Sequence, residues 1–157
     1  MIAQNSDTKS VIADTRGNIL LAVSFGALVV TKGQFIISPL VPEIITDLGI
    51  TSTQVGVALT LMWLMSSVLH FPSGRISDVL SRKTVIVTSL VASFVGFILL
   101  AITNSYPLFI ISLAIIGSGV GLFIPASFVR IADLFIDKRG EACGINTAAY
   151  ELAGALA

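Results

Sequence analysis

Residues that could form an ion-pair cluster are concentrated in one short stretch, "GRISDVLSRK". It contains Gly74, Asp78, Arg82 and Lys83. In a helix, residues four apart share a face, so Gly74, Asp78 and Arg82 would align and Asp78 could pair with Arg82. The glycine would let another backbone approach closely. A plain basic turn needs no Asp78, so the pattern favours a functional charge cluster, with a solvated turn bearing weak surface pairs as the alternative.

The composition indicates which kind of protein carries this cluster. Of the 157 residues, 55% are hydrophobic and 11% charged, and the mean hydropathy is +0.97. Soluble domains are about a quarter charged, so the class is a polytopic membrane protein. Nine basic and nine acidic residues cancel, which leaves no nucleic-acid-binding footprint. One cysteine and one histidine provide no catalytic or metal-binding set, so we expect neither an enzyme nor a cofactor.

The apolar runs predict an all-α transmembrane bundle over residues 18–157, preceded by a polar cytoplasmic tail at 1–17. The runs are apolar all round and lack the alternation of a membrane β-barrel. Spanning takes about 20 residues. The expected spans are 19–41, 53–71, 84–103, 108–129 and a fifth from 142, which is only about 16 residues long at Ala157. The short fifth span predicts that the chain is a fragment of a longer protein.

Basic residues predict the orientation of the bundle. The first connection, "PEIITDLGITSTQ", holds Glu43 and Asp47 but no base, and "NSYP" holds no charge. The bases outside the spans fall in the tail and in alternate connections: Lys9, Arg16, Arg75, Arg82, Lys83, Arg130, Lys138 and Arg139. Cytoplasmic loops are enriched in Lys and Arg. We therefore predict a plasma-membrane protein with a cytoplasmic N-terminus.

Three polar residues inside the predicted spans are candidates for a solute or ion path. Lys32 lies about 20 Å along the first span and is followed by Gln34, and Glu151 lies about 14 Å into the fifth. Ionisable residues at such depth usually face the bundle interior. Lys32 could contact an anionic solute or form a proton-responsive pair with Glu151. The alternatives are snorkelling or a purely structural Lys–Glu pair, which we favour for Glu151.

The charged stretch resembles the loop signature of the major facilitator superfamily, Gly-x-x-x-Asp-Arg-x-Gly-Arg-Arg/Lys. Gly74, Asp78, Arg82 and Lys83 match this signature, whereas Val79 and Ser81 depart from it. The segment "SGVGLFIPASFVRIADLFIDKRGEACGINTAAYELAG" resembles helices four and five of the family, with Pro125 and Asp133 at corresponding positions. The resemblance covers residues 18–157.

The resemblance implies the N-terminal half of a secondary transporter that moves a small solute by alternating access, with the C-terminal half missing. Asp78, Arg82 and Asp133 would latch this half against that half or a partner bundle. Proton coupling is in doubt because Leu113 replaces an arginine common in the family. The expected partners are the lipid bilayer and a small solute, with an anionic solute as one option. The alternative function is a small helical membrane protein that acts as a subunit or an inactive remnant.

The predicted orientation can be tested by cysteine labelling in a Cys143→Ser background. A membrane-impermeant thiol reagent applied to intact cells should label Ser105→Cys, in the outer loop, and spare Ser81→Cys, in the cytoplasmic turn. Both cysteines should react once the cells are permeabilised. Labelling of Ser81→Cys but not Ser105→Cys in intact cells would reverse the orientation.

Overall fold

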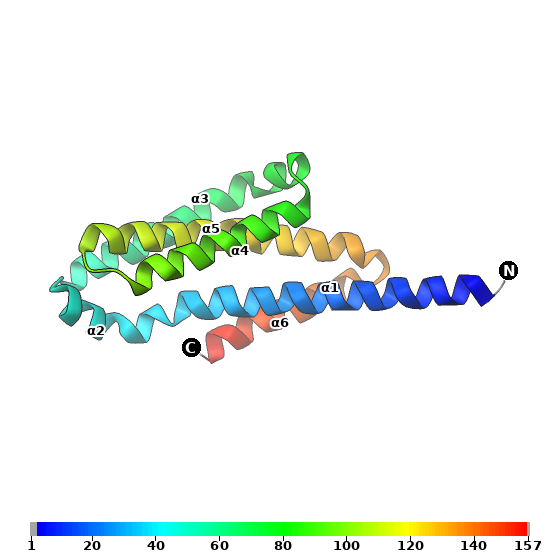
Figure 1. Ribbon diagram of the computed structural model, residues 1–157, viewed down its shortest axis with the longest axis horizontal. Coiled ribbons are helices and arrows are strands. Elements are labelled where there is room, and N and C mark those ends of the chain that lie inside the picture. The colour runs from blue at the N-terminus through cyan, green and yellow to red at the C-terminus, as the bar shows by residue number, and fades with distance from the viewer. Residues whose placement is uncertain (1–2, 157) are drawn as a thin grey trace.

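The computed structural model describes the chain over residues 3–156 and its side chains over 15–76 and 79–156. This part of the chain is helical, without strands, which confirms the all-α prediction (Figure 1). The α-helices are α1 (Ala3–Phe35), α2 (Ile37–Leu48), α3 (Ser52–Val79), α4 (Arg82–Ala101), α5 (Tyr106–Leu134) and α6 (Arg139–Ala155), and a short 3-10 helix (Ile136–Lys138) precedes α6.

Four helical segments of the described chain are long and apolar enough to cross a membrane. They are Thr15–Leu48, Ser52–Ile76, Arg82–Ala101 and Tyr106–Leu134. Three of the five expected spans lie within these segments, and a fourth, 84–103, overlaps Arg82–Ala101 but extends two residues beyond it. The fifth prediction corresponds to α6, which has 17 residues and falls short of the roughly 20 that spanning requires.

The connection predicted between the first two spans is much shorter than expected. Most of "PEIITDLGITSTQ" belongs to α2, which contains Pro42. The helix ends at Gly49, whose φ of 61° is left-handed and whose N–H bonds the Ile45 carbonyl. Two residues later, Thr51 and Gln54 form a capping box that starts α3. The C-cap at Gly49 ends one helix and the capping box at Thr51 begins the next, so the connection is only residues 49–51. Glycine adopts the left-handed C-cap conformation at little cost.

The second and fourth predicted spans were too short at their C-terminal ends, because Pro72 and Arg130 were read as helix ends. The third helix, α3, continues eight residues beyond Phe71 to Val79 and contains Pro72. The fifth, α5, continues past Val129 to Leu134 and contains Pro125. Membrane helices tolerate proline because neighbouring helices and local adjustments satisfy the freed backbone groups. At the N-terminus, α1 runs through the predicted tail boundary at residue 17 without a break.

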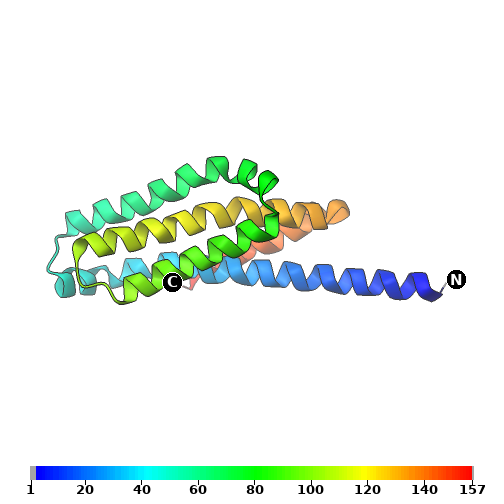
Figure 2. The same cartoon turned by 45° about the horizontal axis from the view of Figure 1, so that its top comes forward.

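The helix α5 is the centre of the bundle. It packs along α4 on one side and along α3 on the other, and α6 lies beside α1 (Figures 1 and 2). Contacts of Ser24 with Asn146 and of Lys32 with Leu156 show that α1 and α6 run in the same direction. The start of α1 extends beyond the other helices, as Figure 2 shows.

Glycines on α5 bring its backbone against its two neighbours. A Cβ on Gly117 would collide with the Met62 carbonyl oxygen on α3, and one on Gly121 would collide with the Ser66 carbonyl oxygen. On the opposite side, a Cβ on Gly119 would collide with the Ser93 hydroxyl on α4. Small residues permit this approach in membrane helices. The run "GSGVG" is therefore a packing surface, as its Gly-x-x-x-Gly spacing predicts.

We expect Gly117→Ala to destabilise the bundle. The methyl group would push against backbone atoms that cannot rotate away, and overpacking of this kind costs about 1–3 kcal/mol. The matched control is Gly56→Ala on α3, where a Cβ would meet no atom within 4 Å. This control should be neutral or slightly stabilising, because alanine is the better helix former. Thermal unfolding in detergent measures both, and equal melting temperatures would contradict the packing role.

Candidate functional site

The charged stretch is two helix ends and not one continuous helix. Gly74 and Asp78 lie on the last turns of α3, and Arg82 is the first residue of α4. Between them, Leu80 is extended, with φ −95° and ψ 143°. The Ser81 hydroxyl caps α4 by accepting a hydrogen bond from the Thr84 N–H at 3.3 Å. The expectation that Gly74, Asp78 and Arg82 share one helical face is therefore wrong for Arg82.

The structure brings together two of the three residues of the expected latch. The Arg82 guanidinium pairs with the Asp133 carboxylate and joins the first turn of α4 to the last turn of α5. Their side chains are 29% and 46% exposed, so the pair is accessible to water, and such pairs contribute only about 0–1 kcal/mol. The side chain of Asp78 lies outside the described residues.

Each partner of this ion pair opposes the dipole of its own helix. A base is unfavourable at a helix N-terminus and an acid at a C-terminus, by about 0.3–1 kcal/mol each. Arg82 and Asp133 occupy those positions. The contact between them offsets part of these two penalties. Helix stability alone would favour the reverse placement of the charges, so this arrangement indicates a role other than stabilising α4 or α5.

The remaining residues of the motif do not join this pair. A Cβ on Gly74 would meet no atom within 4 Å, so no described part of this chain makes the close approach predicted there. Lys83 is exposed and takes part in neither of the ion pairs found among the described side chains, Arg82–Asp133 and Lys138–Glu141. The α3 surface around Gly74 is free for a contact from outside the bundle.

Lys32, Gln34 and Glu151 lie in three different environments. The Lys32 ammonium donates a hydrogen bond to the Leu156 carbonyl oxygen at 3.0 Å, at the end of α6. Among the described side chains no carboxylate lies within ion-pair distance of Lys32, and Glu151 is exposed. The Gln34 side chain is buried, and its amide nitrogen has no hydrogen-bond partner in the described structure. The proposed Lys32–Glu151 pair is thus not formed in this conformation.

A buried polar junction between α1, α5 and α6 was not predicted. Ser24 donates to the Asn146 carbonyl oxygen at 3.5 Å, and the Asn146 amide donates to the Ser127 hydroxyl at 3.4 Å. Ser127 also lies 3.2 Å from the Tyr150 hydroxyl. The spacing of Asn146 and Tyr150, four residues apart in an apolar segment, is the signal in the sequence that could have revealed it. Hydrogen bonds of this kind hold membrane helices together.

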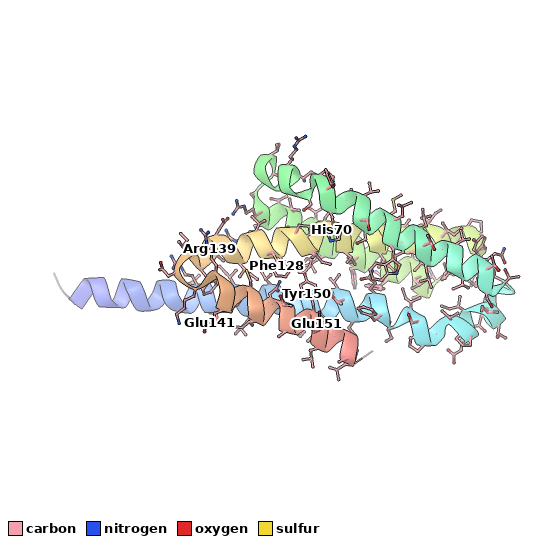
Figure 3. All side chains as sticks on the ribbon, turned by 180° about the vertical axis from the view of Figure 1, so that it is seen from behind. His70, Phe128, Arg139, Glu141, Tyr150 and Glu151 are labelled. Carbon is pink, nitrogen blue, oxygen red and sulfur yellow. The ribbon has the colours of Figure 1, made fainter. Side chains whose placement is uncertain are left out.

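Aromatic pairs lie on the side of the bundle away from α4. The rings of Phe128 on α5 and Tyr150 on α6 stack with centroids 6.0 Å apart, and Figure 3 shows both residues on this side with Glu151. Phe35 on α1 meets Trp63 on α3 edge to face at 6.5 Å. Trp63 remains 49% exposed. Four helices therefore contribute aromatic surface, which suits contact with apolar or aromatic groups.

The fold is that of a multi-pass helical membrane protein. The Major Facilitator Superfamily sequence profile matches residues 23–157, so the chain belongs to the Major Facilitator Superfamily. It is similar to an uncharacterized MFS-type transporter of Mycobacterium tuberculosis, with 30% identity over 141 residues that cover 88% of this chain and 20% of the relative.

Two further relatives have a named substrate class. The multidrug transporter protein MdtP of Bacillus subtilis is 31% identical over 140 residues, which cover 88% of this chain and 25% of that protein. A triacylglyceride transporter of Mycolicibacterium smegmatis is 29% identical over 149 residues, which cover 90% and 27%. The chain thus spans between 20% and 27% of the length of these relatives.

The contact of Lys32 with a backbone carbonyl predicts that Lys32 and Glu151 are energetically independent. In a double-mutant cycle of Lys32→Gln and Glu151→Gln, scored by thermal stability in detergent, the coupling energy should stay below about 0.5 kcal/mol. Lys32→Gln alone should lower stability, because it removes the bond to the end of α6.

Rescue of Lys32→Gln by the second substitution would instead reveal a Lys–Glu ion pair. Removing one partner of a buried pair leaves an unpaired charge, whereas removing both leaves none. The matched control is Glu43→Gln, an exposed acid on α2, which should show no coupling to Lys32→Gln.

Proposed function

We propose that this chain is part of a secondary transporter that moves a small solute across the plasma membrane by alternating access, with its N-terminus in the cytoplasm. The observation that carries the proposal is the ion pair of Arg82 and Asp133. It joins two helix ends at the turn between the second and third spans, where the charges oppose both helix dipoles. A pair that is weak and exposed can break and reform as the transporter changes conformation.

The contact that this latch would regulate comes from outside the described bundle. The open surface at Gly74 and the aromatic face of α1, α3, α5 and α6 would meet a second bundle, contributed by a longer chain or by a partner. Asp78 would complete the charge cluster on this surface, and Lys83 would lie beside the cluster at the seam between α1 and α4. Solute would pass between the two bundles and would be exposed to one side of the membrane at a time.

We infer that the solute is apolar or amphipathic. Aromatic pairs from α1, α3, α5 and α6 support this inference. The names of the multidrug and triacylglyceride relatives agree with such a solute. Gln34, with an unpartnered amide nitrogen, could donate a hydrogen bond to a solute oxygen.

Charge exchange tests the latch in the transporter as it is expressed in cells. Arg82→Asp and Asp133→Arg should each slow the efflux of a lipophilic fluorescent dye, because like charges then face each other. Losing a pair worth about 1 kcal/mol shifts the conformational ratio about five-fold. The double exchange should restore most of the rate. Membrane insertion should be unchanged, as measured by the protein level in isolated membranes.

The matched control is the exchange of Lys138 and Glu141, an exposed pair 3.4 Å apart at the same end of the bundle, which should leave efflux unchanged. If both single variants at Arg82 and Asp133 transport normally, the turn is only a solvated connection. If the wild type shows no efflux of any lipophilic dye above vector-only cells, the chain acts by association and not by transport.

A further inference from the structure

Two buried polar side chains on one face of α1 lack hydrogen-bond partners. Thr31 is 7% exposed and Gln34 is 5% exposed, and neither the Thr31 hydroxyl nor the Gln34 amide nitrogen bonds to any group in the described structure. Other hydroxyls in the spans, such as that of Ser112, donate to the carbonyl four residues earlier. A buried polar group without a partner raises the free energy of the conformation that contains it. These two residues are therefore held at a cost to stability.

The described helices enclose both groups, so a partner can reach them only if the helices move. Val30 and Ile37, on the same face of α1, belong to the buried core that α1 forms with α3 and α5. Gln34 lies between them, one turn from each. Additional chain packed on the outside of the bundle would not change this burial. Any hydrogen bond from Thr31 or Gln34 to solute or water therefore requires another conformation.

The contacts of α5 indicate which helix can move. A Cβ on Gly117 would collide with backbone atoms of Met62 on α3, whereas a Cβ on Gly26 of α1 would lie 3.2 Å from the ring of Phe123 on α5. Rings can change rotamer, and backbone carbonyls cannot. The helices α3, α5 and α4 are thus locked together through backbone contacts, whereas α1 packs against them through side chains.

Two features place the movement in the C-terminal part of α1, residues 31–35. At Ser24 the helix is tied to α6 by a hydrogen bond, and Gln34 lies about 15 Å further along. Just beyond Gln34, α1 ends at Phe35, and Pro39 has no N–H to bond the Phe35 carbonyl. A second hydrogen bond joins this part of α1 to the end of α6, so the end of α6 would move with it.

We propose that the C-terminal part of α1 separates from α5 during the transport cycle, and that Thr31 and Gln34 then hydrogen-bond to an uncharged oxygen of the solute. This subsite rests on the proposed function and narrows the solute to a molecule with an acceptor, such as a carbonyl oxygen. The Gln34 amide nitrogen donates, and the Thr31 hydroxyl both donates and accepts. Because neither group has a partner in the described conformation, a ligand that bonds to them stabilises the separated one. Water can form the same hydrogen bonds, so the experiment must distinguish water from solute.

Cysteine accessibility tests the movement without requiring transport. In a Cys143→Ser background, Thr31→Cys in isolated membranes should react with methanethiosulfonate ethylammonium at about 0.1–10% of the rate of Ser105→Cys, because minor conformations have populations of this order. The matched control is Ser93→Cys on α4, also buried and with an unpartnered hydroxyl, which lies against Gly119 in the locked part of the bundle. It should react about ten-fold more slowly than Thr31→Cys, or not at all. Equal rates at Thr31 and Ser93 would overturn the proposal.

Two lipophilic cations separate a solute contact from hydration. The rhodamine ethyl ester carries an ester carbonyl, and tetraphenylphosphonium has no oxygen. The rhodamine ester should slow the reaction of Thr31→Cys, and Gln34→Leu should lower kcat/KM for its efflux about five-fold, as expected for one lost hydrogen bond. Efflux of tetraphenylphosphonium should be unchanged. Equal loss for both cations, or no protection of Thr31→Cys by the ester, would overturn the solute contact and leave water as the partner.

Thermal stability in detergent separates this role from a structural one. Gln34→Leu should not lower the melting temperature, because it removes an unsatisfied group and leaves no partner unpaired. Ser24→Ala on the same face should lower it, because Asn146 loses a hydrogen bond. An equal fall for Gln34→Leu would show that Gln34 is bonded within the bundle and would overturn the proposal. If the wild type exports neither cation above vector-only cells while Thr31→Cys reacts, the proposed function and the solute contact both fail, whereas the movement of α1 stands.

Discussion

The close approach of α5 to two neighbouring backbones is the constraint on which the rest of the bundle depends. At Gly117 and Gly121, backbone carbonyl groups of α3 lie where a Cβ would otherwise be, and at Gly119 residues of α4 do so. Water provides no driving force between helices in lipid, so such contacts must supply the packing energy through close van der Waals fit. Because three alternating glycines serve two opposite faces, α5 fixes the spacing of both partners at once. The turn from α3 to α4 and the C-terminal end of α5 are then held next to each other at the same end of the bundle.

This placement explains how a weak ion pair can have a defined geometry. Arg82 and Asp133 meet because the helices beneath them are already fixed, and the pair need not hold α4 and α5 together. Its own contribution is small, since both side chains are partly exposed, and each charge opposes its helix dipole. An ion pair that adds little stability is suited to switching. A modest change in its surroundings can shift the ratio between the conformation with the pair formed and the one with it broken.

Much of this arrangement could be predicted from the sequence, and the failures have physical causes. Apolar runs predicted the all-α class and four spans, and the Gly-x-x-x-Gly spacing predicted helix packing, because both depend on local composition. Helix ends were misplaced where Pro72 lies inside a helix, since neighbouring helices override its local effect. The break at Leu80 was missed because the four-residue spacing of charges predicts a helix equally well. The junction around Asn146 depends on contacts between distant segments.

Polar groups within the spans show why the two sides of the bundle differ. Ser24, Ser127, Asn146 and Tyr150 use their hydrogen-bonding groups on one another, and Lys32 donates to a backbone carbonyl. These neutral polar groups are therefore satisfied within the bundle, on the side where aromatic rings provide apolar contacts and Glu151 is an exposed charge. On the α4 side, Lys83 and Arg130 are the bases without a described acid. The hydrogen-bonded junction and these two bases therefore lie on different sides of α5.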